Sequence, residues 1–287
     1  MSEPEILLDA RLELGEGPAW HARTQTLYWV DITGKQLHSL KAEHRTLEVD
    51  DYIGCVAPCK DGSLVAAIGR RLCRVEPETG AVTTLATPDE PTTNRFNDGK
   101  CDPAGRFLAG TMDLAHRSPS GSLYSLEPGG GLTRLLDGIR ISNGLAWSPD
   151  HATMYYIDTP TREVKAFDYD VETGELAFRR VAIRVPQKLG SPDGMTSDTD
   201  GLLWIGMWRG ASVTRWDPKS GQLLEQIPVP ALNVTSVAFG GGDMQVLYIT
   251  TARQGVDEAA LRKYPHSGAV FQLQTSVVGM PTFEFGG

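Results

Sequence analysis

The sequence predicts an all-β protein, a six-bladed β-propeller with four-stranded blades, and three observations carry this prediction. Six short apolar strands recur at spacings of 37, 43, 47, 48 and 45 residues. Each apolar strand is followed by a polar turn, an alternating segment and a further strand. The resulting repeat has the length typical of a propeller blade, roughly 40–50 residues. No segment shows a sustained helical period. A pair of β-sandwiches, the alternative all-β fold, gives no reason for six repeats.

The elements can be assigned in chain order from period-two alternation bounded by Gly, Asp and Pro. The apolar strands are expected at residues 27–32, 64–69, 107–112, 154–159, 202–207 and 247–252. Alternating third strands follow, as at 121–126 and 212–216, and fourth strands come after Gly-containing turns at 82–85, 176–181 and 222–227. Residues 257–263 come nearest to a helix, of one or two turns.

The six units fill the chain, so residues 1–287 are expected to form a single domain. Propellers usually close the ring by pairing the chain ends within one blade, because an open edge strand invites aggregation. Residues 5–12 and 282–285 are therefore both expected to complete the blade that contains residues 246–252.

Composition and charge exclude several classes of function. The 27 basic and 36 acidic residues give a net charge of −9, and no basic run suggests a nucleic-acid surface. The N-terminus lacks the pattern of a signal peptide, and no apolar run approaches the roughly 20 residues of a membrane span. The four cysteines form no CxxC pair and are expected to be buried free thiols. We expect a cytoplasmic protein without nucleic-acid or membrane partners.

The repeat register brings polar residues together. Counting back ten or eleven residues from each apolar strand predicts a ring at one end of the channel, formed by Glu16, Gly54, Asn97, Asn143, Asp193 and Ser236. Two carboxylates and two amides that face one another need a partner, because desolvated like charges repel. Since all the donors are oxygens, the sequence predicts one divalent cation, with Ca²⁺ favoured and Mn²⁺, Mg²⁺, Fe²⁺ and Zn²⁺ as alternatives.

At these residues the sequence resembles the SMP-30/gluconolactonase/regucalcin family of six-bladed propellers. The motifs that match in order are Leu14-Gly15-Glu16-Gly17-Pro18, Asn94-Arg95-Phe96-Asn97-Asp98-Gly99-Lys100, Ser142-Asn143-Gly144, Ser191-Pro192-Asp193-Gly194 and Thr250-Thr251-Ala252-Arg253. The resemblance implies that Glu16, Asn143 and Asp193 bind the metal and that Arg95 and Asn97 contact the substrate. It implies a lactonase that opens a sugar lactone, such as gluconolactone, xylonolactone or arabinonolactone, to the aldonic acid.

One position departs from the family. Many relatives carry a Glu that touches the sugar shortly after the Gly-Thr-Met motif, where this chain has Met112-Asp113-Leu114. Asp113 is the candidate substitute for that contact. In the expected reaction the metal acts as a Lewis acid on the lactone carbonyl while water attacks. Asp193 is the first candidate for the general base and Asp98 the second.

Other functions stay open. A non-catalytic propeller that binds calcium or a protein partner is one alternative, although it would not need Arg95 and Asn97. A hydrolase of organophosphates or aryl esters, with a more apolar channel mouth, is another.

The histidines are interpreted mostly as solvated turn residues, and no G-x-S-x-G motif suggests a serine esterase. The tryptophans are expected in the core, with Trp208 as a flank of the site. The expected partner is a small sugar lactone, and the expected state is a monomer or a weak homo-oligomer.

Overall fold

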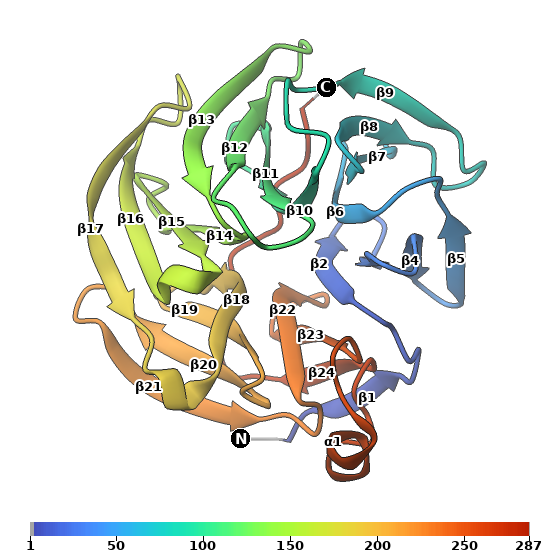
Figure 1. Cartoon of the computed structure of the whole chain (residues 1–287), viewed down its shortest axis with the longest axis vertical. Coiled ribbons are helices and arrows are strands. Elements are labelled where there is room, and N and C mark those ends of the chain that lie inside the picture. Colours follow the sequence, from blue (N-terminus) through green and yellow to red (C-terminus); the bar gives the residue numbers. More distant parts are fainter. Residues whose placement is uncertain (1–2, 287) are drawn as a thin grey trace.

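Six four-stranded antiparallel sheets surround a central channel in the computed structural model, which describes residues 3–286 (Figure 1). The predicted six-bladed β-propeller is therefore confirmed. We number the blades 1 to 6 by their innermost strands, and the six apolar strands of the repeat each lie second from the channel. Each of these strands begins and ends within one residue of its predicted bounds.

The strands fall into four concentric sets. The innermost strands are β2 (Gly15–His21), β6 (Ile53–Pro58), β10 (Asn94–Cys101), β14 (Ser142–Trp147), β18 (Ser191–Ser197) and β22 (Asn233–Gly240). The second strands are β3 (Thr26–Asp31), β7 (Leu64–Ile68), β11 (Phe107–Asp113), β15 (Thr153–Asp158), β19 (Leu203–Trp208) and β23 (Val246–Ala252). The third strands are β4 (Gln36–Leu40), β8 (Arg71–Val75), β12 (Gly121–Leu126), β16 (Glu163–Tyr169), β20 (Ser212–Asp217) and β24 (Val270–Gln274). The outermost strands are β5 (His44–Glu48), β9 (Val82–Ala86), β13 (Leu132–Ile139), β17 (Leu176–Arg184), β21 (Gln222–Pro228) and β1 (Glu5–Leu8).

Helical structure is confined to short segments. Two 3₁₀ turns, η1 (Thr159–Thr161) and η2 (Gln187–Leu189), and one α-helix, α1 (Glu258–Lys263), occur among residues 3–286. Helix α1 lies in the segment 257–263, which came nearest to a helix in the sequence. It begins after Asp257, whose side chain accepts a hydrogen bond from the backbone N–H of Ala260 (2.8 Å). No helix in the described chain has the length and apolar character that a membrane span requires.

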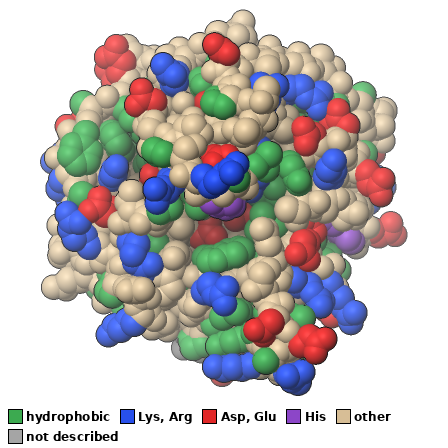
Figure 2. Space-filling model, viewed as in Figure 1, with side chains coloured by type: hydrophobic (Ala, Val, Ile, Leu, Met, Phe, Trp, Pro, Cys, Tyr) green, Lys and Arg blue, Asp and Glu red, His purple; other side chains and the backbone are tan. Residues whose placement is uncertain are grey.

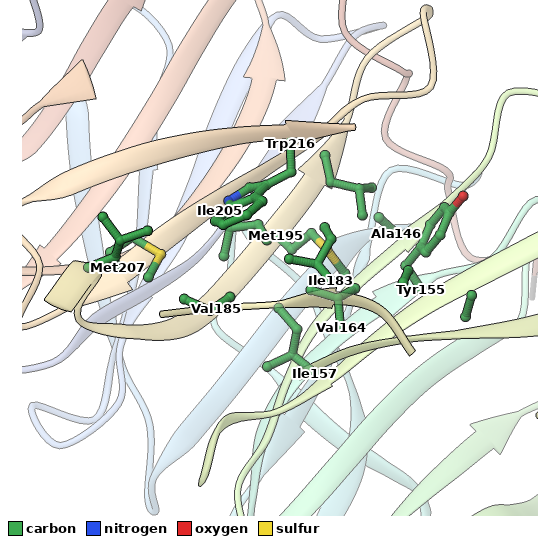
Figure 3. Close-up of a cluster of buried hydrophobic side chains, with 14 residues drawn as sticks. Ala146, Tyr155, Ile157, Val164, Ile183, Val185, Met195, Ile205, Met207 and Trp216 are labelled. Atoms are coloured by element: carbon green, nitrogen blue, oxygen red, sulfur yellow. The ribbon is translucent and has the colours of Figure 1, made fainter. Parts of the chain in front are cut away.

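The apolar runs of the second strands are buried on both faces because each sheet packs between two neighbours. Figure 3 shows this packing between blades 4 and 5, where Ile157 and Ile183 meet Met195 and Ile205. All four side chains are at most 1% exposed. The four cysteines are likewise buried free thiols, as predicted. This packing fixes the radial position of each innermost strand and therefore the shape of the channel.

Blade 6 closes the ring with strands from both ends of the chain. Its order is β1-β24-β23-β22, and Glu5 pairs with Gln272 at its outer edge. The expectation for residues 5–12 is thus confirmed for Glu5–Leu8. The expectation for residues 282–285 is wrong, because β24 takes the third place in the sheet and β1 the fourth.

The last residues instead form a tail, residues 275–286, that crosses one end of the channel. Figure 1 shows this dark red segment running from the side of β18 across the ring to its end near β9 and β12. It contacts every blade: Gly279 N–Met244 O (2.8 Å), Met280 N–Ser197 O (3.0 Å), the rings of Phe283 and Trp147 (6.3 Å), Gly286 N–Gly105 O (2.9 Å), Phe285 N–Pro58 O (2.8 Å) and Glu284 Oε1–His21 Nε2 (3.0 Å). His21 is therefore buried at this end, and it is an exception to the expectation that most of the histidines are solvated turn residues.

Every innermost strand carries an irregularity at the same place in its pairing with the second strand. The pairing shifts directly after Glu16 and Asn143, and in the other four strands it skips Gly54, Asn97, Asp193 and Thr235. A β-bulge of this kind leaves a residue unpaired and turns its side chain away from the regular alternation. The repeat thus positions the same kind of irregularity six times around one channel.

Candidate metal centre and substrate pocket

A pocket of about 210 Å³ lies at the end of the channel opposite the tail. Glu16, Asn97, Asn143 and Asp193 line it, as the repeat register predicted, together with Arg95. Figure 2 shows a central hollow with acidic side chains inside it and histidine and Lys or Arg side chains at its edge. This open side of the channel is called the pocket end below, and the side covered by the tail the sealed end.

A directional chain of hydrogen bonds orders the polar groups of the pocket. Arg95 Nη1 donates to Asn97 Oδ1 (2.7 Å), and Asn97 Nδ2 donates to Asn143 Oδ1 (3.0 Å). Asn143 Nδ2 then donates to the Thr159 hydroxyl (2.8 Å), which donates to the carbonyl of Pro192 (2.9 Å). Because every link has one donor and one acceptor, the chain fixes the orientation of both amides. Asn143 Oδ1 keeps a second lone pair free for another partner.

The carboxylates of the pocket are only partly compensated by the positive charge of Arg95. Burial, followed by the charge of Asp98, raises the pKa of Glu16 to about 8, against an opposing hydrogen bond from Gly17 N–H. Burial also raises the pKa of Asp193 well above its ordinary value, and the charges of Glu16 and Asp98 add to this effect. Burial in turn lowers the pKa of the nearby Arg95 to about 10. The site therefore favours protons on its acids unless another cation enters.

The donor set fits a divalent cation. Asp193 Oδ1 is buried without a hydrogen-bond partner among the described residues, so one carboxylate oxygen is left for a ligand. Within residues 3–286 no three His, Cys, Asp or Glu side chains gather into a metal-binding group. A set made of Glu16, Asn143 and Asp193 therefore depends on the amide oxygen of Asn143. Carboxylate and amide oxygens are ligands that Ca²⁺ and other hard cations prefer, with water completing the shell.

The inner strands approach one another too closely for larger residues beside these donors. A Cβ at Gly144 would lie 2.7 Å from the backbone oxygen of Asp193, and one at Gly194 would lie 2.0 Å from Ser236 Oγ. Both glycines directly follow a candidate ligand in the sequence. The Asn-Gly and Asp-Gly pairs thus allow the close approach of β14, β18 and β22 that brings the donors to one channel.

Asp98 lies on the other side of these donors. It lines a chamber of about 30 Å³ at the sealed end, with Lys100, Ser236 and Met280, and it is not part of the pocket lining. Its Oδ1 accepts a hydrogen bond from Gly99 N–H (2.7 Å), and burial raises its pKa. The chamber has room for water but not for a sugar.

Two positions of the predicted ring lie elsewhere. Ser236 lines the sealed chamber, and Gly54 lines neither the chamber nor the pocket. In β22 the unpaired residue is Thr235, whose hydroxyl bonds to the backbone oxygen of Gly15 (2.5 Å). The predicted ring of six positions is therefore reduced to four in the pocket: Gly54 has no side chain to contribute, and the bulge in β22 comes one residue earlier than the sequence count implied for Ser236.

Asp113 does not reach the pocket lining. Its carboxylate accepts hydrogen bonds from the backbone N–H groups of Ala115 (3.3 Å), Arg117 (2.9 Å) and Ser118 (3.3 Å), so it organises the turn after β11. His116 is the residue of this turn that lines the pocket, where burial and then the charge of Arg95 lower its pKa. His116 is exposed in this turn, as expected for most of the histidines, but its place in the pocket lining was not predicted.

The rest of the lining combines apolar walls with one further polar group. Trp208 lines the pocket, as expected, opposite apolar side chains that include Met112 and Ile141. Gln254, just beyond β23, also lines it and was not predicted. The Gln lies in a connecting loop that no repeat pattern marks.

Comparison with known proteins shows which family and which solved structures this chain is similar to. A family profile described as SMP-30/Gluconolactonase/LRE-like region matches residues 14–253. The chain is 40% identical to regucalcin from Danio rerio, over 99% of this chain and 98% of the relative. A calcium-binding protein, regucalcin, from Agrobacterium tumefaciens has a TM-score of 0.93 at 28% identity, covering 99% and 97% of the two chains. A gluconolactonase from Xanthomonas campestris has a TM-score of 0.76 at 27% identity, covering 96% and 95%.

Proposed function

This chain belongs to the SMP-30/gluconolactonase/LRE-like family, and from that premise we propose that it is a metal-dependent lactonase that opens a sugar lactone to the aldonic acid. The observation that carries the proposal is the convergence of Glu16, Asn143 and Asp193 on one pocket, with Asp193 Oδ1 left without a partner. The gluconolactonase from Xanthomonas campestris supports the substrate class.

Glu16, Asn143 and Asp193 would hold one divalent cation, for which Ca²⁺ is the first candidate. When bound, such a cation supplies Lewis-acid polarisation of the lactone carbonyl and compensates the carboxylate charge. The chain's own groups provide the remaining steps. Arg95 would orient the substrate through the guanidinium N–H groups that do not bond to the protein. Asn97 would contact the substrate at Oδ1, because its N–H groups already donate to Ser142 O and Asn143 Oδ1, and this hydrogen-bonded chain keeps both residues fixed.

Asp193 is the proposed general base. One of its carboxylate oxygens accepts a proton from the attacking water as the new bond to the carbonyl carbon forms. Breaking the bond between that carbon and the ring oxygen gives a carboxylic acid and a free hydroxyl, and the proton returns to the ring oxygen. The second candidate, Asp98, lines the sealed chamber instead of the pocket, which favours Asp193.

Pocket size and lining support a sugar over a larger ester. At about 210 Å³ the pocket is smaller than sites for drug-sized ligands, and it offers polar groups that an aryl ester would leave unpaired. A non-catalytic calcium-binding role is the second candidate, because the regucalcin from Agrobacterium tumefaciens is described as calcium-binding. Arg95 and Asn97 favour the enzyme, since a calcium buffer does not need a substrate clamp.

The test is a rate panel on metal-stripped protein. Gluconolactone, xylonolactone, arabinonolactone, an aryl acetate and an organophosphate triester are assayed with Ca²⁺, Mn²⁺, Mg²⁺, Fe²⁺ or Zn²⁺ added singly. We expect metal-dependent hydrolysis of at least one sugar lactone above the spontaneous rate. Tight calcium binding without turnover of any lactone would support the calcium-binding alternative, and turnover of the aryl ester or triester alone would support the other hydrolase.

A further inference from the structure

The hydroxyl of Thr159 lies between the strands that carry two of the proposed metal ligands. It accepts a hydrogen bond from Nδ2 of Asn143 (2.8 Å), on β14. It donates to the carbonyl of Pro192 (2.9 Å), which directly precedes Asp193 on β18. Thr159 lines the pocket, but its single proton is used within the protein, so the hydroxyl has no donor left for a ligand. Its influence on the site therefore acts through Asn143.

The backbone of Thr159 is fixed beside the start of β14. Its N–H donates to the carbonyl of Ile141 (3.1 Å), and its own carbonyl accepts from the N–H of Arg162 (3.0 Å), which closes η1. The preceding carboxylate, Asp158 Oδ1, accepts from the N–H of Ile141 (2.9 Å). The hydroxyl is thus held in place by the same segment that leads to Asn143.

The direction of the hydrogen-bond chain is determined from both of its ends. The guanidinium of Arg95 has only donors, so Asn97 must turn its Oδ1 toward it. The carbonyl of Pro192 is only an acceptor, so it takes the proton of Thr159 and leaves that hydroxyl as the acceptor for Nδ2 of Asn143. A cation can bind to the oxygen of an amide but not to its nitrogen, so this direction decides whether Asn143 can serve as a ligand.

The two hydrogen bonds to the Asn143 amide differ in what they leave open. Asn97 bonds to Oδ1, which is the atom that a cation would bind. Thr159 bonds to Nδ2, on the other branch of the planar amide, and leaves the second lone pair of Oδ1 free. The bond to Thr159 is therefore the one that holds the amide without sharing the ligand atom.

We infer that Thr159 is a positioning residue for metal binding, whose hydroxyl holds the amide of Asn143 so that Oδ1 is presented as a ligand. The inference rests on the proposed function and deepens it, because it names a residue outside the ligand set that controls the affinity for the cation. Without the hydroxyl, Nδ2 of Asn143 loses its acceptor and the amide is free to turn. Loss of a group that orients a ligand typically changes metal affinity by about 10–100-fold.

The experiment measures the binding of Ca²⁺, and separately of Mn²⁺, to the metal-stripped full-length protein by calorimetric titration. Thr159→Val keeps the β-branched shape but removes the hydroxyl, and the dissociation constant should rise about 10–100-fold. Thr159→Ala lacks the hydroxyl without adding a methyl group, so it should show a similar loss. Thr159→Ser keeps the hydroxyl and should recover most of the affinity. The matched control is Thr161→Val in the same turn, where the hydroxyl donates to the carbonyl of Asp158 (2.7 Å), and its affinity should be unchanged.

A double change separates the orientation of the amide from a general loosening of the fold. In Asn143→Asp the side chain carries two oxygens, so no orientation has to be selected. Adding Thr159→Val to this variant should weaken binding by less than about threefold, because the two changes act on one interaction and are not additive.

Two results would overturn the inference: Thr159→Val that binds both cations as tightly as the unmodified protein, or an equal loss of affinity when Asn143→Asp is already present. Either result leaves the proposed lactonase intact. An unmodified protein that binds neither cation and hydrolyses no lactone with any metal overturns the proposed function itself.

Discussion

The two ends of the channel are built by the same six innermost strands, but they differ in whether several of their polar side chains have hydrogen-bond or ion-pair partners. At the pocket end, Asp193 Oδ1 and Gln254 Oε1 are buried without partners. At the sealed end, Lys100 donates to the carbonyl of Met195 (2.7 Å) and Glu284 pairs with His21 (3.0 Å). The indole N–H of Trp147, beside the tail, is also buried without a partner in the described chain, so the contrast is limited to the groups named here. Unpaired buried groups are unfavourable for folding, and we therefore expect the pocket end to serve binding and the sealed end to serve stability.

The largest expected effect is on catalysis at the pocket end. Asp193→Asn keeps one acceptor oxygen but removes the charge and the basicity, so kcat should fall about 10²–10⁴-fold at saturating metal. The measurement is kcat against metal concentration, with Asp98→Asn beside it. Asp98→Asn should have a smaller effect because Asp98 lines the sealed chamber. Full rescue of the Asp193 variant by metal would exclude it as the base and favour Asp98.

At the sealed end a large effect is expected on stability instead. Phe285 is 2% exposed and packs with the core between blades 2 and 3. Phe285→Ala should lower the free energy of unfolding by about 3–5 kcal/mol, measured by chemical denaturation, with kcat of the folded protein nearly unchanged. Phe178→Ala is the control, since Phe178 is 61% exposed and its loss should change stability by about 0.5 kcal/mol or less. A loss of kcat larger than the loss of folded protein would contradict the division between the two ends.

A smaller effect on turnover is expected from the substrate clamp. Asn97→Ala removes the group that links Arg95 to Asn143, and kcat/KM should fall roughly ten- to a hundredfold. Metal affinity, measured by calorimetric titration, should be retained because the proposed ligands remain. Unchanged kcat/KM on sugar lactones would refute the role of Asn97.

The smallest expected effect is a pH dependence of metal stabilisation. The pKa of Glu16 is about 8 in the metal-free fold against an ordinary 4.5, so its stabilising contribution is present below 4.5 and is lost as the pH rises through 8. Metal binding needs the carboxylate form, so the rise in Tm on adding Ca²⁺ should grow from about pH 5.5 to about pH 8.5. Glu16→Gln should weaken this trend. A Ca²⁺-induced rise in Tm that is larger at the acidic pH would contradict the assignment of Glu16.

The sequence predicted the blades well because one physical pattern, an apolar strand buried between sheets, repeats six times. The same register predicted that Glu16, Asn97, Asn143 and Asp193 meet, since equivalent positions on inner strands face one channel. It could not separate Asn97 from its neighbour Asp98, because the bulge between Phe96 and Gly99 sends consecutive side chains to opposite ends.

The repeat pattern could not predict where the side chains of the loops lie. Asp113 and His116 lie three residues apart in one turn, and backbone hydrogen bonds decide that the carboxylate stays in the turn while the imidazole lines the pocket. Gln254 follows the last apolar strand, where only the contacts of its backbone with Glu13 and Asn233 bring it to the pocket. The roles of Glu16, Asn143 and Asp193 in metal binding, and of Arg95 and Asn97 in substrate binding, stay predictions.

The pairing of β1 with β24 also constrains the order in which the blades can fold. During synthesis β1 leaves the ribosome first, yet its partner strand is among the last segments to emerge, so blade 6 stays incomplete while blades 1 to 5 can form. Contacts between such distant segments form slowly, because the long intervening chain must first be ordered. The tail can reach all six blades only after that step. A chain that ends before Glu284 would therefore lose tail contacts with blades 1, 2 and 3, and the loss would not be confined to one blade.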